Sequence, residues 1–327
     1  MAADRLSLAL QSGLLSLPEE GRILALAPKG PGDLVALPQD NTLALQPMKP
    51  AHDAITAAGF ECALTTEGRF AAAIVFLPRA KALAQALIAK AAQIADRVYV
   101  DGQKTDGVDS LLKACKKRSD ILGSFSKAHG KLFWFEGGDF SDWVAADQQT
   151  IEGGYQTAPG VFSADGVDPA SRALVAALPE KLGKQVADLG AGWGYLSRAI
   201  LERADVETLY LVEADHAALH CARANVSDSR ADFHWADATT WEPRARMNAV
   251  VMNPPFHTGR TADPDLGRAF IAAAARMLAP TGQLWMVANR HLPYEAALGD
   301  LFAKVEEVAG DNRFKILRAE RPARARR

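Results

Sequence analysis

Short apolar runs of strand length alternate with amphipathic stretches of helical period along the second half of the chain, from Lys184 onward. Strands that alternate with helices predict a parallel, doubly wound sheet whose ligands bind at the carboxyl ends of the strands. Arg313–Arg318 is expected to be a last strand, antiparallel at an edge of this sheet. The other expected strands are Gln185–Leu189, Leu209–Val212, Asp232–Trp235, Asn248–Met252 and Gln283–Ala288, and the expected helices are Tyr195–Arg203, a segment that ends at Ala224, and Leu266–Leu278.

The first half repeats this alternation more weakly, which indicates an internal duplication. Val98–Lys104 matches Leu284–Arg290 in pattern, each before a helix, and Lys131–Phe135 matches Lys315–Arg318 at the closing strand. The alternative is that two α/β domains resemble each other at this level without a duplication. The expected strands of this half are Arg22–Ala27, Thr42–Leu45, Ala71–Leu77 and Arg97–Val100, and its expected helices are Pro50–Ala58 and Lys81–Ala95.

The chain has 327 residues, too many for one ordinary domain and enough for two that each bury a core. The expected fold class is α/β, with two tandem doubly wound, Rossmann-like domains over residues 1–150 and 151–327. A linker is expected around Ala146–Pro159, which is rich in Gly, Gln and Thr.

The two halves differ at the strand ends where ligands would bind. The first strand is followed by Ala25–Gly30 in the first half and by the glycine-rich Asp188–Gly194 in the second. In the first half the second strand ends in Gln46-Pro47, without a carboxylate, and the fourth ends in Phe76–Arg79, without an amide. We therefore expect the first domain to be a degenerate copy and the second to carry the site.

The glycine loop Asp188–Gly194, which reads Asp-Leu-Gly-Ala-Gly-Trp-Gly, lies between a predicted strand and a predicted helix. Glycines there let the backbone approach a ligand closely, because no Cβ intervenes. In a dinucleotide enzyme the third glycine would fall at Tyr195, where a large side chain obstructs helix–strand packing. The pattern instead favours S-adenosylmethionine (AdoMet), whose amino-acid end has no phosphate. The alternative is a tight structural turn. The candidate cofactor-binding residues of the loop are Asp188, Gly190, Gly192 and Gly194.

Two further acids follow the next two predicted strands. Glu213 ends the second strand, about 20 residues after the loop, where a carboxylate can accept hydrogen bonds from both ribose hydroxyls. Asp237 follows the third strand and is placed to accept from the adenine amino group. The alternatives are an ordinary exposed acid at Glu213 and a helix cap at Asp237. Their succession at consecutive strand ends favours the cofactor-binding interpretation of both.

The motif Asn253-Pro254-Pro255-Phe256 at the end of the fourth strand indicates the chemistry. The exocyclic amine of a base is a poor nucleophile, because its lone pair is conjugated into the ring. The Asn253 side-chain oxygen and the Pro254 carbonyl can accept its two N–H groups, turn the lone pair toward the sulfonium methyl and stabilise the developing positive charge. Phe256 offers a face on which the base can stack. No strong general base is needed, and the alternative is a rigid turn without a catalytic role.

Other residues of interest have weaker interpretations. His257 is expected to shape the pocket rather than to accept a proton, and Val161–Ser163 either closes over the cofactor or packs as a hydrophobic staple. The formal net charge of −2 gives no global basic field, so nucleic acid would have to bind through local patches. The candidate phosphate contacts are Lys113, Lys116, Lys117, Arg118 and the tail from Arg313 through Arg327, although such runs are usually solvated faces.

The three cysteines have no metal or redox spacing, which suits a reducing cytoplasm with buried thiols. The N-terminus lacks the basic start and uninterrupted apolar core of a signal peptide. No apolar run approaches the roughly 20 residues that span a bilayer. We therefore expect a cytoplasmic protein with no membrane partner and no metal.

Four stretches match a known family, namely Gly160–Asp168, Asp188–Gly194, Asn253–His257 and Val287–Tyr294. Over roughly Gly160–Arg318 the chain resembles the bacterial ribosomal RNA small-subunit methyltransferase C and large-subunit methyltransferase G group, which are guanine-N2 methyltransferases. The resemblance is weaker before this region, where members of the group carry a degenerate methyltransferase-like domain. It implies class I methyltransferase domains and a first domain for RNA recognition or structural support.

The resemblance also implies roles for single residues. Trp193 departs from it, because this side chain is bulkier than expected in the glycine loop, and the first half has diverged. The residues implied are Asn253, Pro254 and Phe256 at the base, and Gly190, Gly192, Glu213 and Asp237 around the cofactor.

The expected function is direct transfer of a methyl group from AdoMet to the N2 amine of a guanine in ribosomal RNA, with small-subunit RNA the favoured target. The guanine would be splayed or flipped from its helix to reach the pocket. The expected partner is ribosomal RNA or a ribosomal subunit. The alternatives are an adenine-N6 methyltransferase on RNA or DNA, because the motif serves either amine, a protein-glutamine methyltransferase, a non-catalytic RNA-binding assembly factor and, remotely, a dinucleotide oxidoreductase.

Overall fold

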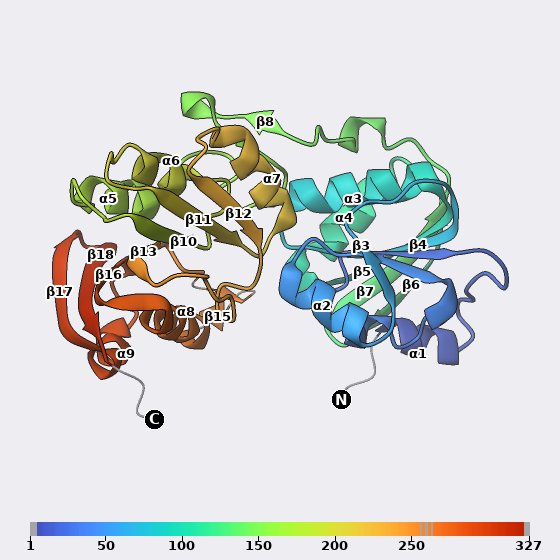
Figure 1. The fold of residues 1–327 in the computed structure, drawn as a ribbon. Helices are drawn as coiled ribbons and strands as arrows, with labels where there is room; N and C mark the ends of the chain where they lie inside the picture. The colour runs from blue at the N-terminus through green and yellow to red at the C-terminus, as the bar shows by residue number, and fades with distance from the viewer. Residues whose placement is uncertain (1–4, 256, 259–260, 263, 324–327) are drawn as a thin grey trace. The chain divides into compact units, whose positions relative to one another are not determined.

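The computed structural model describes residues 5–255, 257–258, 261–262 and 264–323. The chain divides into two compact units, Met1–Asp147 and Gln148–Arg327, and each contains a seven-stranded mixed sheet (Figure 1). In the described part of the chain, no helix has the length and apolar character that crossing a bilayer requires.

The first unit has the strand order β3-β2-β1-β4-β5-β7-β6. The strands from β3 to β5 in this order are parallel, whereas β7 is antiparallel to both of its neighbours. Its strands are β1 (Ile23–Leu26), β2 (Thr42–Leu45), β3 (Glu61–Ala63), β4 (Phe70–Phe76), β5 (Ala95–Gln103), β6 (Ile121–Lys127) and β7 (Gly130–Glu136). Its α-helices are α1 (Arg5–Gln11), α2 (Lys49–Ala57), α3 (Lys81–Ile94) and α4 (Val108–Cys115).

The second unit has the corresponding order β12-β11-β10-β13-β16-β18-β17, again with one antiparallel strand, β18, in the sixth place. The strands of this sheet are β10 (Gln185–Leu189), β11 (Thr208–Glu213), β12 (Ala231–Trp235), β13 (Met247–Met252), β16 (Leu278–Asn289), β17 (Phe302–Gly310) and β18 (Phe314–Pro322). Its α-helices are α5 (Pro169–Ala177), α6 (Tyr195–Leu201), α7 (His216–Asn225), α8 (Pro264–Met277) and α9 (Tyr294–Leu301). Two short hairpins complete it, β8 (Gln149–Thr150) with β9 (Gln156–Thr157) and β14 (His257–Thr258) with β15 (Thr261–Ala262).

The identical strand order confirms the expected fold class of two tandem doubly wound, Rossmann-like domains. Both local comparisons pair equivalent strands, since β5 and β16 take the fifth place in their sheets and β7 and β18 take the sixth. Any two unrelated α/β domains would share alternation of strands and helices, but a common order of seven strands is far more specific.

One expectation about the place of a strand in the sheet was wrong. The strand at Arg313–Arg318 is β18, which lies between β16 and β17 and is not at an edge. The edge strand is β17, which was not predicted, because most of its residues are exposed and carry no alternating apolar pattern. The linker expected around Ala146–Pro159 contains the β8–β9 hairpin, and from Gln148 onward it belongs to the second unit.

The central strand β13 positions the site because both of its faces are buried. Val250 and Met252 pack in one hydrophobic cluster with residues of α8 and α9, whereas Ala249 and Val251 pack in a second cluster with residues of α5, α6 and α7. Figure 1 shows these two groups of helices on opposite sides of the sheet. A strand held on both faces fixes where its carboxyl end lies, and the residue at that end is Asn253.

Candidate active site

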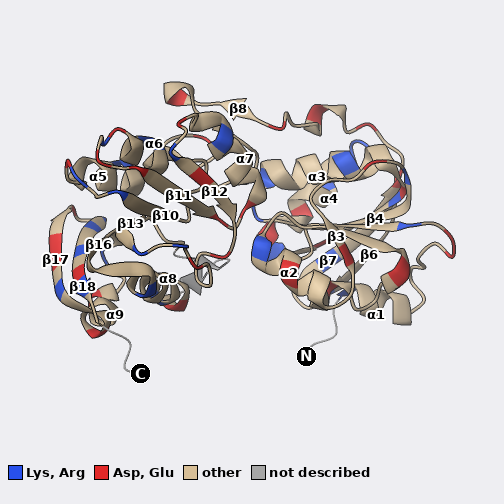
Figure 2. Ribbon diagram, viewed as in Figure 1, with Lys and Arg blue, Asp and Glu red and all other residues tan. Residues whose placement is uncertain are grey.

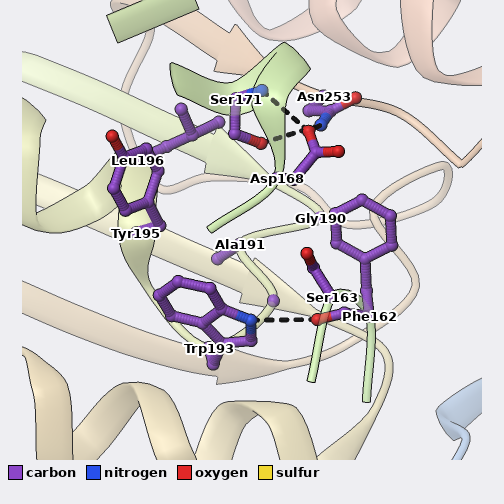
Figure 3. Close-up of a pocket in the computed structure, with 11 residues that line it drawn as sticks. Phe162, Ser163, Asp168, Ser171, Gly190, Ala191, Trp193, Tyr195, Leu196 and Asn253 are labelled. Carbon is purple, nitrogen blue, oxygen red and sulfur yellow. Dashed lines mark hydrogen bonds between the residues drawn. The ribbon is translucent and has the colours of Figure 1, made fainter. Parts of the chain in front are cut away.

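A pocket with an empty volume of about 370 Å³ lies at the carboxyl ends of β10 and β13 (Figure 3). Three parts of the second unit line it: the glycine loop from Gly190 to Leu196, the segment Phe162–Ser171 that leads into α5, and Asn253. This is the edge of a doubly wound sheet where ligands bind.

The glycine loop needs its glycines for their backbone conformation. Gly190, Gly192 and Gly194 have φ values of +73°, +55° and +91°, in the left-handed region that other residues disfavour. At Gly194 a Cβ would also lie 3.0 Å from a methyl group of Val226. Gly190 and Gly192 line the pocket, whereas Gly194 caps the N-terminus of α6.

Asp188 lies beneath the loop and is fully buried. Its Oδ2 accepts a hydrogen bond from the hydroxyl of Ser197 at 2.6 Å, and its Oδ1 has no partner among the described residues. Burial raises the pKa of Asp188 to about 7. Asp188 therefore supports the loop from below, next to the pocket that Gly190 and Gly192 line.

Glu213 and Asp237 lie at the ends of β11 and β12, as the sequence predicts. Glu213 Oε2 accepts the backbone N–H of Gly192 at 2.7 Å, and Oε1 accepts that of Asp215 at 2.7 Å. Burial raises the pKa of Glu213 to about 7, against the opposing effect of these N–H donors. Asp237 Oδ1 accepts the backbone N–H of Thr239 at 2.8 Å and its hydroxyl at 2.7 Å. Asp237 thus closes a turn rather than capping a helix, and Glu213 is tied directly to the loop.

Asn253 is the polar residue that β13 presents to the pocket. Its Nδ2 donates to Asp168 Oδ2 at 3.0 Å and to Ser171 Oγ at 2.8 Å (Figure 3). Its Oδ1 is buried and has no hydrogen-bond partner among the described residues. Pro254 is buried beside it, and Phe256 lies outside the described residues. A buried acceptor without a donor is costly unless a ligand satisfies it, so Oδ1 marks the place where an N–H group would bind.

The segment before α5 is fastened to the glycine loop by Trp193. The indole Nε1 donates to the carbonyl of Phe162 at 2.9 Å, and the ring packs against Tyr155 and Tyr195 with centroids 5.1 and 5.9 Å away. Phe162 is 59% exposed and its ring lies at the pocket, whereas Val161 is buried with Trp193. The bulk of Trp193 therefore has a structural reason.

Taken together, the geometry offers a backbone cradle, a carboxylate tied to it and an unsatisfied amide oxygen around one pocket. This arrangement suits a cofactor with ribose hydroxyls beside a substrate that donates N–H groups. Among the residues that the structure describes, no group of three or more His, Cys, Asp or Glu side chains could hold a metal ion.

The methyltransferase small domain model matches residues 152–318, a stretch that includes every residue around this pocket. The chain belongs to the methyltransferase small domain family. Members named ribosomal RNA small subunit methyltransferase C include one from Hahella chejuensis, 27% identical over 80% of this chain and 80% of the relative. Another, from Salmonella choleraesuis, is 31% identical over 68% of this chain and 66% of the relative.

Two further comparisons cover different shares of this methyltransferase. A ribosomal RNA large subunit methyltransferase G from Streptomyces avermitilis is 39% identical over 49% of this chain and 43% of the relative. A solved T. thermophilus 16S rRNA N2 methyltransferase, in complex with AdoMet and guanosine, has a TM-score of 0.81 at 25% identity. It covers 98% of this chain and 92% of its own, so the likeness extends over both units.

The first unit of the methyltransferase lacks the catalytic pattern at the corresponding strand ends. The residue after β4, which is the counterpart of β13, is the buried Leu77 in place of an asparagine. Beside it, Arg5 is only 5% exposed, and its Nε donates to Asp101 at 2.6 Å. A pocket therefore lies at these strand ends too, but the Arg5–Asp101 ion pair lines it and no asparagine follows β4.

The candidate phosphate contacts differ in their exposure and in their contacts within the protein. The guanidinium of Arg118 pairs with Asp142 and lies 4.5 Å from the ring centroid of Trp143. Lys113, Lys116 and Lys117 are exposed. Residues 324–327 of the basic tail lie outside the described residues. Figure 2 shows basic and acidic residues interspersed over both units, in keeping with the net charge of −2.

Sequence reasoning missed Asp168 and Ser171 as site residues. The sequence does contain a local signal, because Asp followed by Pro is a helix N-terminus signature, and Asp168 caps α5. Nothing local indicates that this cap also binds Asn253, which lies 85 residues away along the chain.

Proposed function

We propose that this chain transfers the methyl group of AdoMet to the exocyclic N2 amine of a guanine in ribosomal RNA. The observation that carries the proposal is Asn253, which lines the pocket together with the glycine loop and whose buried Oδ1 has no partner among the described residues. The relatives named above support the choice of guanine over adenine, because the solved T. thermophilus enzyme is an N2 methyltransferase bound to guanosine.

In the proposed reaction, Asn253 Oδ1 and the carbonyl of Pro254 accept the two N–H groups of the amine. This contact turns the nitrogen lone pair toward the sulfonium methyl and stabilises the positive charge that develops as the N–C bond forms. Phe256 is proposed to stack on the base. The nitrogen loses its proton after transfer, when it is strongly acidic, so the chemistry needs no dedicated base.

The cofactor is proposed to lie along the strand ends from β10 to β12. AdoMet would place its methionine end against Gly190, Gly192 and Gly194, above Asp188, and its ribose hydroxyls on Glu213. Asp237 would accept from the adenine amino group through the carboxylate oxygen that does not bind Thr239. The proposed partner is ribosomal RNA or a ribosomal subunit, which implies the cytoplasm, and the first unit is proposed to recognise RNA or to support the second.

The test is methyl transfer from labelled AdoMet to naked ribosomal RNA, isolated ribosomal subunits and duplex DNA, followed by nucleoside analysis. Label in N2-methylguanosine is the expected result, and the preferred RNA form identifies the substrate. Label in N6-methyladenine would overturn the guanine assignment, and no label in any nucleic acid would overturn the proposal.

Asn253→Ala gives the matched test of the mechanism. Loss of one preorganised polar contact costs about 10²- to 10³-fold in kcat, and we expect a loss of this size. Asn312→Ala removes an exposed asparagine of the same unit, away from the pocket, and should leave kcat unchanged. Full activity of the Asn253 variant would contradict the proposed role of its oxygen.

A further inference from the structure

The side-chain amide of Asn253 is anchored at its nitrogen. Both of its N–H donors have acceptors, one on Asp168 Oδ2 at 3.0 Å and one on Ser171 Oγ at 2.8 Å. Its oxygen is buried and has no partner among the described residues, and Asn253, Asp168 and Ser171 all line the pocket. Figure 3 shows the three side chains converging at one side of the pocket.

The identity of these acceptors decides which way the amide faces. An asparagine amide has two orientations that exchange oxygen and nitrogen, and they differ in the group shown to a ligand. Ionised aspartate only accepts hydrogen bonds, so a turned Asn253 would set its Oδ1 against the Asp168 carboxylate with no proton between them. The hydroxyl of Ser171 tolerates either orientation, because it both donates and accepts. Asp168 therefore selects the observed orientation.

Asp168 is itself fixed by the start of α5. It is the N-cap of this helix, and the same Oδ2 accepts the backbone N–H of Ser171 at 2.8 Å. Pro169 begins the helix, and the helix residues Ala170 and Leu174 are buried. One carboxylate oxygen thus joins a packed helix to the residue at the end of β13, so the amide has little freedom to turn.

We propose that Asp168, assisted by Ser171, is a positioning residue for methyl transfer, which orients Asn253 so that its oxygen accepts an N–H of the target amine. This inference rests on the proposed function, in which the substrate presents two N–H donors. A turned Asn253 would point its own N–H groups at those of the amine, and neither bond would form. The negative charge on Asp168 also polarises the amide and strengthens Oδ1 as an acceptor.

Asp168→Ser separates this role from the helix cap. Serine caps helices about as well as aspartate, so the melting temperature should change little. Its shorter side chain carries a hydroxyl in place of the carboxylate. This hydroxyl can donate or accept, so it no longer selects one orientation of the Asn253 amide. We expect kcat to fall about 10- to 100-fold, the loss seen when an orienting partner is removed at metal centres, with an unchanged Kd for AdoMet. Asp205→Asn is the control, since Asp205 accepts the backbone N–H of Gly183 at 2.6 Å and does not line the pocket.

A double-mutant cycle in single-turnover kinetics distinguishes positioning from general support. If Asp168 acts through Asn253, Asp168→Ser should have no further effect in a protein that already carries Asn253→Ala. The same loss in both backgrounds would overturn the proposal and make Asp168 a residue of stability alone.

A measurement without substrate separates this proposal from the proposed function. The chain has six asparagines, so selective ¹⁵N-asparagine labelling gives six side-chain amides, and Asn253→Ala assigns one of them. The Asn253 amide protons should exchange with solvent about tenfold more slowly in the wild type than in Asp168→Ser, and Asp205→Asn should not change them. Equal exchange would overturn the positioning role. A wild type with slow exchange but no methyl transfer would overturn the function and leave the orientation standing.

Discussion

If Glu213 binds the ribose as proposed, its raised pKa predicts an affinity for AdoMet that depends on pH near neutrality. Burial raises this pKa to about 7, and the proposed ribose contact needs the ionised carboxylate, which accepts from both hydroxyls. Protonated Glu213 must lose its proton before it binds the ribose in this way. AdoMet binding should therefore strengthen as pH rises through 7, with release of a proton.

The magnitude follows from the ionised fraction. With a pKa of about 7, about 9% of Glu213 is ionised at pH 6 and about 91% at pH 8, so the Kd should fall about tenfold between these values. This change corresponds to about 1.4 kcal/mol of binding free energy. Burial also raises the pKa of Asp188 to about 7, and the charge of Glu213 is a smaller cause of this shift.

The assay is isothermal titration calorimetry with AdoMet at pH 6, 7 and 8, in buffers of different ionisation enthalpy that count the released protons. Glu213→Gln is the matched variant, since it keeps the size of the side chain and an acceptor oxygen. The ratio of wild-type to variant affinity should grow about tenfold from pH 6 to pH 8. Because the variant experiences any titration of AdoMet itself, a constant ratio would refute the reasoning.

Three further variants probe the frame around the pocket. The pKa of Asp188 is higher in the folded protein than its ordinary 3.8, so its contribution favours folding at acidic pH and is lost as pH rises toward 7. The free energy of unfolding of the apoprotein, measured by denaturant titration, should therefore fall less between pH 5 and pH 8 in Asp188→Asn than in the wild type. Gly194→Ala should lower the free energy of unfolding by about 1–2 kcal/mol, because Gly194 has a positive φ and Val226 lies close to it. An unchanged melting temperature in calorimetry would contradict this prediction. Trp193→Phe leaves the Phe162 carbonyl without its donor and should cost about 1–3 kcal/mol, whereas unchanged chemical denaturation would mean that this bond contributes nothing.

The sequence predicts strands best where both faces of the sheet are buried. Gln185–Leu189 was predicted at the bounds that β10 has, since four of its five residues are buried and three of these four are apolar. The strands β6 in the first unit and β17 in the second were not predicted, and each takes the last place in its sheet. Both are edge strands with few buried residues, so hydrophobic packing imposes little pattern on them.

Some residues of the candidate site could be predicted from the sequence, and others could not. Gly190, Glu213 and Asn253 follow consecutive strands, and parallel strands bring their carboxyl ends to one edge, so the sequence alone can group them. The contact of Asn253 with Asp168 depends on how α5 packs against the sheet, and no periodicity encodes it. The local turn at Asp237, in which Thr239 donates two hydrogen bonds to the carboxylate, was also not predicted from the sequence.

The matched strand orders of the two units bear on how such a chain can evolve. In the first unit the buried strands are present, while a leucine follows β4 and the Arg5–Asp101 ion pair lies at the strand ends. The residues that hold a sheet together and those that hold a ligand are therefore separate sets, and one set can change while the other is conserved in character. An asparagine at Leu77 would change one buried residue and leave the Arg5–Asp101 ion pair beside it, so a single substitution would not give the first unit the pocket of the second.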